Sequence, residues 1–300
     1  MTVDDEADIS LPDCVTSGDK RMSQMIDEAA TSRVVNTRAL HVRVLLQLPR
    51  IAESDGRMPA RSVRAEVNWV AGQLADDVEK TTGRVSEGLR RLHRLSFAPV
   101  PAAQAAPIIT HRHYLQSARE GSQYFALLDP RGLPVSICSV SPLQWRRVAA
   151  RIEANFGIPR ERVWDVSRVF SCDDAPYGAI SHLLARVRSW MRQNSFGVDL
   201  LTTAVDRNLG FSGGSYRAAN WQHWFTVQPR PYLYHNRFYV SPRQLRRRFG
   251  SATIADLQKA HPDQTFEVSR IRLRESLIFC WRLRGETEFI PESERPRIRR

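Results

Sequence analysis

Apolar positions in the N-terminal third of the chain recur with the spacing of helices. One stripe follows steps of four, three, four and four residues, which puts its members on one face of a helix that ends at Thr81-Thr82-Gly83. The stripe consists of Val63, Val67, Val70, Leu74 and Val78. Weaker patterns predict a helix from Ser32 to Gln47 and a short helix over residues 85–92. Residues 1–30 show no such period, and we predict a disordered tail there.

The pattern changes to that of strands near Leu95. Short apolar runs predict strands over residues 95–101, 124–128 and 135–140. The turn Asp129-Pro130-Arg131-Gly132 separates the last two runs, which therefore read as a hairpin. A helix is predicted over residues 142–154.

The segment from residue 162 onward has the clearest pattern. Residues 162–170 alternate apolar with polar positions, as in a strand, and residues 179–194 form a strongly amphipathic helix. Residues 198–205 are mostly apolar, which is typical of a buried central strand. A glycine-rich turn leads to a short predicted helix over residues 215–224, and strands are predicted over 232–240 and 268–283.

This order of elements indicates an α+β domain with a mixed central sheet flanked by helices. We place that domain at residues 95–285, between a small helical extension over residues 31–94 and a basic C-terminal tail over residues 286–300. The extension could be a module that binds a partner or reads DNA. Its weak amphipathicity favours a structural cap on the following domain.

Charge changes the picture more than bulk composition does. The chain of 300 residues has 44 basic and 32 acidic residues, a net charge of +12. Residues 1–30 hold eight acids and two bases, so the other 270 residues carry +18. A basic body of this size favours a polyanionic partner, most often nucleic acid, although a solvated arginine-rich surface is equally compatible. Four arginines gather in one short segment: Arg243, Arg246, Arg247 and Arg248.

Several classes of protein are disfavoured. The apolar fraction of 42% is ordinary for a globular protein, and no apolar run is long enough to cross a membrane. The acidic N-terminus lacks an apolar signal region, which indicates a cytoplasmic protein. The four cysteines lie far apart, so we expect reduced thiols and no cysteine zinc site. His111 and His113 could bind a metal, but a structural role is favoured and no metal site is predicted.

The loop before Ala179 offers a candidate anion site. It brings backbone N–H groups and a helix N-terminus to one point, which suits a pyrophosphate. Gly178 alone is weak support, because most loops that precede helices bind nothing.

The order of elements resembles the GCN5-related N-acetyltransferase (GNAT) fold. In that fold a strand splays from its neighbour, acyl-CoA lies in the gap, and its pyrophosphate rests on the next helix N-terminus. Within this superfamily the chain resembles the Mom family of bacteriophage adenine-modification proteins, over roughly residues 95–285. The segments that carry the resemblance are HRHYL (111–115), SRVFSCDDAPYGAIS (167–181), VD (205–206), NLGFSGGSYRAANW (208–221) and YHNRFYVSPRQLRRRFG (234–250).

The resemblance implies catalytic roles for His113, Ser181, Asp206 and Tyr216. Transfer of an acyl group to an exocyclic amine needs a proton acceptor for the amine and an acid for the leaving thiolate. Tyr216, with an ordinary pKa of about 10, can be that acid. Asp206 or His113 could accept the amine proton, directly or through water.

The resemblance also implies a cofactor and a partner. Acetyl-CoA, or another acyl-CoA, would be bound by Phe170, Ser171, Gly178 and Ala179, with backbone N–H groups beside Phe170 holding the thioester oxygen. Double-stranded DNA would be held by Arg168, Arg217 and the four clustered arginines. The target adenine would leave the base stack and could stack on Trp221, Trp224 or Phe211.

Two functions of different class follow from these residues. The first is acyl-CoA-dependent modification of adenine N6 in DNA. The second is a non-catalytic DNA-binding or defence-associated protein on a degenerate GNAT fold. The second is supported by departures from the family pattern, because only Gly178 remains of the glycines in the pyrophosphate loop and Phe211 replaces a histidine. In addition, Asp206 could simply cap a turn and Ser181 could be an ordinary polar helix position.

Overall fold

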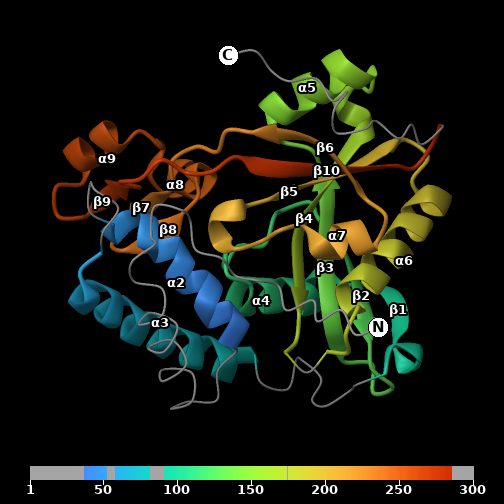
Figure 1. Cartoon of the computed structure of the whole chain (residues 1–300), viewed down its shortest axis with the longest axis horizontal. Helices are drawn as coiled ribbons and strands as arrows, with labels where there is room; N and C mark the ends of the chain where they lie inside the picture. The colour runs from blue at the N-terminus through green and yellow to red at the C-terminus, as the bar shows by residue number, and fades with distance from the viewer. Residues whose placement is uncertain (1–36, 53–57, 82–90, 174, 286–300) are drawn as a thin grey trace.

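The computed structural model describes residues 37–52, 58–81, 91–173 and 175–285 (Figure 1). The acidic tail, most of the short helix over 85–92 and the C-terminal tail lie outside these residues. The C-terminal tail was predicted to be basic, but four glutamates balance its four arginines over residues 286–300. Within the described residues, no helix combines the length and apolar character needed to cross a membrane.

A seven-stranded mixed sheet forms the centre of the molecule, as the hydrophobic pattern predicted. Its strands follow the order β1-β2-β3-β4-β5-β10-β6 (Figure 1). Neighbouring strands are antiparallel except for the β4–β5 pair, which is parallel. The strands are β1 (Ser96–Val100), β2 (Gln123–Leu128), β3 (Pro134–Pro142), β4 (Val163–Ser171), β5 (Leu200–Val205), β10 (Ser276–Arg282) and β6 (Gln222–Val227).

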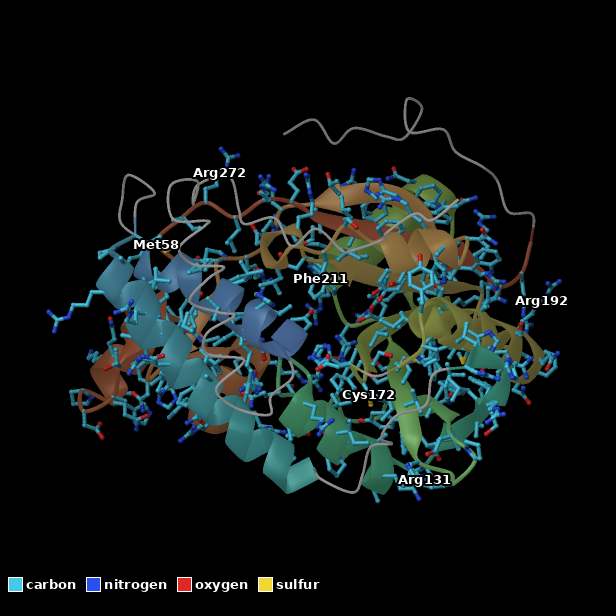
Figure 2. All side chains as sticks on the ribbon, turned by 60° about the horizontal axis from the view of Figure 1, so that its bottom comes forward. Met58, Arg131, Cys172, Arg192, Phe211 and Arg272 are labelled. Atoms are coloured by element: carbon cyan, nitrogen blue, oxygen red, sulfur yellow. The ribbon has the colours of Figure 1, made fainter. Side chains whose placement is uncertain are left out.

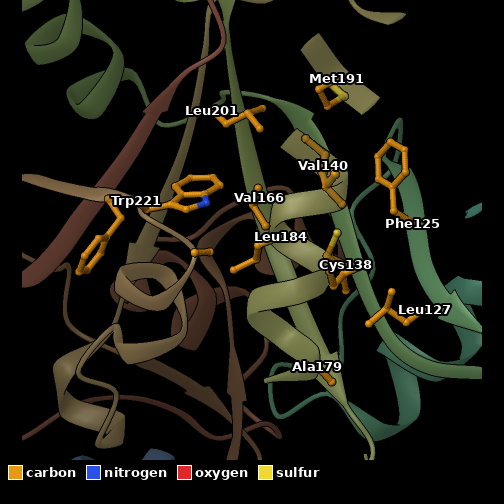
Figure 3. Packing of buried hydrophobic residues seen from close by; sticks show 14 of the residues in the cluster. Phe125, Leu127, Cys138, Val140, Val166, Ala179, Leu184, Met191, Leu201 and Trp221 are labelled. Atoms are coloured by element: carbon orange, nitrogen blue, oxygen red, sulfur yellow. The ribbon is translucent and has the colours of Figure 1, made fainter. Parts of the chain in front are cut away.

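Helices cover both faces of this sheet because alternate strand residues are apolar on opposite sides. On one face lie α4 (Ala102–Arg112) and α5 (Arg146–Phe156). On the other lie α6 (Ala179–Asn194) and α7 (Gly214–Ala218). Figure 3 shows the second face, where Leu184 and Met191 of α6 pack with Val140, Val166 and Leu201 of the strands. Short 3₁₀ turns connect the elements: η1 (Leu92–Arg94), η2 (Arg160–Arg162) and η3 (Arg207–Leu209).

The helix predicted over residues 215–224 is much shorter in the structure. It ends at Ala218, Asn220 adopts a left-handed φ of 62°, and β6 begins at Gln222. Trp221 and Trp224 are both 3% exposed, each within a hydrophobic cluster. Burial of these indoles and pairing with β10 therefore override the helical pattern.

A compact module interrupts the main sheet between β6 and β10. It contains β7 (Leu233–His235), β8 (Phe238–Val240), α8 (Pro242–Phe249), α9 (Ile254–Ala260) and β9 (Phe266–Val268). Its three strands form a second sheet in the order β8-β7-β9, and Leu245, Leu257 and Phe266 form its own core. The single strands predicted over 232–240 and 268–283 are thus each divided. We refer to residues 228–275 as the inserted module.

The N-terminal extension is packed on the inserted module. It consists of α2 (Thr37–Ile51), which continues through Pro49 beyond its predicted end, and α3 (Ala60–Thr81). Apolar residues of both helices contact Tyr232, Tyr234 and Leu273. Buried Glu66 of α3 forms ion pairs with Arg50 of α2 and with Arg237 of the β7–β8 turn. The extension therefore fixes the hairpin whose tyrosines approach the site described next.

Candidate active site

The two parallel strands at the centre of the sheet separate after a short contact. β4 and β5 pair from Val163–Leu200 only to Asp165–Thr202, although β4 continues to Ser171 and β5 to Val205. A last link follows, in which the Thr203 hydroxyl donates to the Val166 carbonyl at 2.9 Å. Beyond this link the two facing strand edges no longer share a hydrogen-bonded ladder.

The separated edge of β4 presents backbone groups toward β5. The Phe170 carbonyl accepts the Ser136 hydroxyl at 3.1 Å, and the Cys172 N–H donates to the Val135 carbonyl at 3.0 Å, so both face β3. Because backbone groups alternate along a strand, those of Val169 and Ser171 face β5. The backbone N–H groups expected to hold the thioester oxygen are therefore those of Val169 and Ser171, and not that of Phe170 itself. The Ser171 hydroxyl is buried and has no partner among the described residues.

Tyr216 reaches the point where the strands separate. Its hydroxyl is hydrogen-bonded to Thr203 Oγ1 at 3.2 Å, and its ring packs against Trp221 and Phe279. Burial raises the pKa of the Tyr216 phenol above its ordinary value. The phenol therefore stays protonated at neutral pH, the form that a proton donor needs, and the raised pKa makes it a weaker acid than a free tyrosine.

Two neighbours set the position of α7, which carries Tyr216. Ser181, in the first turn of α6, donates its hydroxyl to the Ser215 carbonyl at 3.1 Å. Gly213 begins α7 with a φ of 83°, and a Cβ there would lie 2.5 Å from the Phe279 ring. Ser181 thus links α6 to α7 through this hydrogen bond. It has a specific structural contact and is more than an ordinary polar position on a helix.

The start of α6 keeps the features expected of an anion site. Gly178 precedes the helix with a φ of 80°, Ala179 is buried, and no acidic residue lies in the first turn. A Cβ on Gly178 would meet only the Leu92 side chain, at 3.6 Å. The left-handed backbone, and not a lack of space, is what favours glycine here.

Asp206 ends β5 and is fully engaged within the protein. Its Oδ1 accepts the Asn208 backbone N–H at 2.9 Å and the Asn208 side-chain amide at 2.8 Å, while its Oδ2 accepts the Tyr232 hydroxyl. The turn-capping role is therefore real. Burial raises the pKa of Asp206, and these hydrogen bonds oppose the rise. Burial and the Asp206 charge in turn raise the pKa of Tyr239 to about 12.

His113 follows α4 and is buried, at 3% exposure. Its Nδ1 accepts the Leu115 N–H at 3.1 Å, and its ring stacks on Tyr114 at 4.2 Å. Burial and then the Arg168 charge hold the pKa of His113 well below its usual value. The imidazole is therefore neutral at neutral pH. Burial, and then the Asp206 charge, raise the pKa of Tyr114, the phenol on which the His113 ring stacks.

Several residues predicted to contact DNA have other surroundings. Trp221 and Trp224 are buried core residues, so their surroundings give no support to stacking on an extruded base, and that role stays a prediction. Phe211 packs between two hydrophobic clusters, 5.5 Å from Tyr114, and lies between the N-terminal helices and α7 (Figure 2). Arg168 turns inward and donates to the Ser117 carbonyl at 3.0 Å, so it belongs to the interior of the site and not to an outer surface.

The remaining arginines are at the surface, where the DNA prediction needs them. Arg217 is exposed and donates to the Ser212 carbonyl at 2.6 Å. On α8, Leu245 faces the core of the inserted module and the arginines are exposed. These exposed arginines are Arg243, Arg246, Arg247 and Arg248. Their contact with DNA stays a prediction.

Sequence reasoning missed four residues that shape the site. Thr203 and Gly213 have no motif of their own, because their importance comes from contacts with residues far away in the chain. Tyr232 and Tyr239 lie with Tyr234 in a tyrosine-rich segment over residues 232–239, a signal that the sequence does contain. These tyrosines gather on the side of the site that holds Asp206, whereas Ser181 lies on the Tyr216 side.

A mixed sheet whose central parallel pair separates, followed by a helix N-terminus, defines the GNAT class of acyltransferase folds, as the resemblance predicted. Within that class the model of the Mom protein family matches residues 94–276, and the chain belongs to this family. A comparison with curated proteins finds no match.

Solved structures give distant similarities. The spermidine/spermine N-acetyltransferase SpeG from Vibrio cholerae is 6% identical with a TM-score of 0.37, over 64% of this chain and 94% of that one. A putative phosphinothricin N-acetyltransferase is 11% identical with a TM-score of 0.33, over 64% of this chain and 99% of that one. Nourseothricin acetyltransferase is 12% identical with a TM-score of 0.29, over 55% and 67% respectively. Values this low assign no activity.

Proposed function

We propose that this protein transfers an acyl group from acyl-CoA to the N6 amine of adenine in double-stranded DNA. One observation carries the proposal: the Tyr216 hydroxyl is hydrogen-bonded to Thr203 where β4 and β5 separate. A proton donor at that point is where a leaving thiolate would need it. Membership of the Mom family and the basic body support DNA as the acceptor.

The residues around the separated strands fit an acyl-CoA. The backbone edge at Val169 and Ser171 offers hydrogen bonds to an amide-containing arm, and the buried Ser171 hydroxyl has no partner among the described residues. The first turn of α6 after Gly178 would offer N–H groups to a pyrophosphate, but not that of Ala179, which donates to the Pro176 carbonyl at 3.0 Å. When bound, acyl-CoA supplies the acyl group as an activated thioester. Acetyl-CoA is the simplest form to test.

Each nearby side chain then has a specific task. Tyr216 keeps its proton because its pKa is raised, and it would donate that proton to the departing sulfur. Asp206 is the proposed acceptor of the amine proton, because burial makes its carboxylate a stronger base and Tyr232 can relay a proton to Oδ2. The neutral His113 ring uses its acceptor nitrogen for Leu115, so we assign it to positioning Tyr114.

The test compares two tyrosine variants that lose the same atom. Purified protein, acetyl-CoA and duplex DNA are incubated, and modified nucleosides are measured by mass spectrometry. Tyr216→Phe should reduce the initial rate by about 10²–10⁴-fold, the usual effect of losing one acid. Tyr124→Phe removes a hydroxyl on β2, which is bonded only weakly, to the Arg119 carbonyl at 3.4 Å, and should leave the rate unchanged.

The outcomes separate the two classes of function. Equal rates for both variants would remove Tyr216 as the acid while keeping the enzyme. Wild-type protein that modifies no adenine, and whose melting temperature does not rise with acetyl-CoA, would favour the non-catalytic DNA-binding function. The fully engaged Asp206 and the single glycine of the loop are the observations that make this second function worth testing.

A further inference from the structure

The inserted module contains a hollow that the acyltransferase site does not use. Its volume is about 410 Å³, and it opens beside α8 and the turn that leads to α9. Apolar residues such as Leu233 and Pro242 line it, and we call this apolar part of the lining its floor, while Ser251 and Thr253 contribute hydroxyls. Two arginines, Arg230 and Arg246, stand at its wall.

Among the described residues no counter-charge holds these two arginines, in contrast to two other arginines of the module. Arg237 pairs with Glu66, and Arg270 pairs with Glu267. Arg230 and Arg246 are exposed, and in the described part of the chain neither guanidinium has an acidic or hydrogen-bonding partner. Two cations that share one hollow repel each other unless an anion lies between them.

The nearby charges do not neutralise the pair. No acidic residue occurs within α8, and the helix carries three further exposed arginines outside the lining of the hollow. One carboxylate is near: Asp256 accepts the Ser251 hydroxyl at 3.3 Å, but Asp256 is not among the residues that line the hollow and pairs with neither arginine. The hollow therefore combines a net positive rim with an apolar floor.

We propose that this hollow holds a sugar-phosphate unit of the DNA backbone, with Arg230 and Arg246 on the phosphate and the apolar floor under the deoxyribose. The proposal rests on the proposed function, which supplies duplex DNA as the partner. Guanidinium groups bind phosphate through paired N–H donors, and two of them can share one phosphate. A cavity of 410 Å³ is larger than a bare phosphate requires, and apolar carbons suit the sugar.

The lining also indicates what the hollow does not bind. Among the described residues that line it there is no aromatic side chain for stacking and no asparagine or glutamine for reading a base edge. Contact with the backbone positions DNA without selecting its sequence. The cofactor is an unsuitable occupant, because α6 lies on the other side of the molecule from α8 and α9 (Figure 1).

The experiment measures how duplex affinity depends on salt. Binding of a fluorescent duplex is titrated at several KCl concentrations for the wild type, Arg230→Ala, Arg246→Ala and the double variant. Loss of one phosphate contact should lower the slope of log K against log salt by about 0.9. Because both arginines hold the same phosphate, the double variant should lose little more than either single variant.

A matched control separates this site from bulk charge. Arg192→Ala removes one exposed arginine from α6, at the opposite side of the molecule from Met58 and the inserted module (Figure 2). It should leave the slope unchanged. The loss caused by Arg230→Ala should also be equal for two duplexes of unrelated sequence, because the hollow has no means to read bases.

Three results would overturn the proposal. The first is an unchanged slope in both single variants. The second is a loss that depends on the duplex sequence. The third is a pair of results: millimolar inorganic phosphate stabilises the wild type but not the double variant, and the DNA slopes are unchanged in all variants. This pair would show that the hollow binds a free anion and not DNA. The modification rate at saturating DNA is measured separately, so failure of the enzyme function leaves the slope result intact.

Discussion

Replacing Gly213 by alanine tests how tightly the site is built around Tyr216. The new Cβ would lie 2.5 Å and 2.6 Å from two ring atoms of Phe279, whereas carbon atoms normally pack at about 3.5–4.0 Å. Phe279 is completely buried and its ring stacks on Tyr216, so the ring must move by about 1 Å together with its neighbour. Overpacking of this kind costs about 1–3 kcal/mol.

A second cost comes from the backbone. Gly213 has a φ of 83°, and a residue with a Cβ is less stable in this conformation by about 1–2 kcal/mol. The free energy of unfolding should therefore fall by about 2–5 kcal/mol in Gly213→Ala. Displacement of Tyr216 should also slow the proposed modification of adenine.

A control variant isolates the steric part of this cost. Gly157, at the end of α5, has a φ of 65°, and a Cβ there would find no other atom within 4 Å, so Gly157→Ala meets only the backbone cost. The two variants share the left-handed strain and differ in the contact with Phe279. Urea unfolding at 25 °C should show Gly213→Ala to be less stable than Gly157→Ala by about 1–3 kcal/mol.

Equal losses in the two variants would refute this account, because the ring contact would then contribute nothing. A double variant supplies a further check. Phe279→Leu removes the ring atoms that the new Cβ would meet, so Gly213→Ala should cost less in that background than in the wild type.

Two further predictions concern buried polar groups. The pKa of His113 is lowered in the folded protein, so the unfolded chain binds more protons below pH ~6.5. The free energy of unfolding should therefore fall as the pH drops from about 6.5 toward the lowered pKa, by up to about 1.4 kcal/mol per pH unit. His113→Asn keeps an acceptor for Leu115 without a titrating ring, so urea unfolding between pH 5 and pH 7.5 should show a weaker dependence; an identical dependence would assign the effect to other groups. Glu66→Gln leaves Arg50 and Arg237 without their shared carboxylate and should cost about 3 kcal/mol in the same assay, whereas a loss below about 1 kcal/mol would mean that this pair contributes little.

The local hydrophobic pattern predicted the elements around the site well. The strand, helix and strand over residues 162–205 correspond to β4, α6 and β5, because each has a strong period and buries one face locally. The helix predicted over 215–224 failed where two tryptophans are buried by partners distant in the chain. The insertion between β6 and β10 was not predicted, because strand order depends on pairing that the local pattern does not encode.

The sequence indicated which residues belong to the site more reliably than it indicated how each of them is buried or bonded. Tyr216 and Ser181 were selected by motif, and their contacts with Thr203 and Ser215 give them physical roles. Trp221 was chosen because an indole can stack on a base, but the structure buries it in the hydrophobic core. Exposure is a property of the folded chain, so a sequence without a structure cannot distinguish a stacking indole from a core indole.

The central position of β10 has a consequence for the synthesis of the chain. This strand is the last of the main sheet to be made, yet it lies between β5 and β6 (Figure 1). Until residue 282 has left the ribosome, β5 keeps an open edge and β6 has no neighbour in the sheet, and open strand edges promote aggregation. A fragment that stopped at residue 276, where the family match ends, would retain this defect permanently. We therefore expect nascent chains to need protection by chaperones until β10 inserts, and soluble fragments to require the whole strand through Arg282.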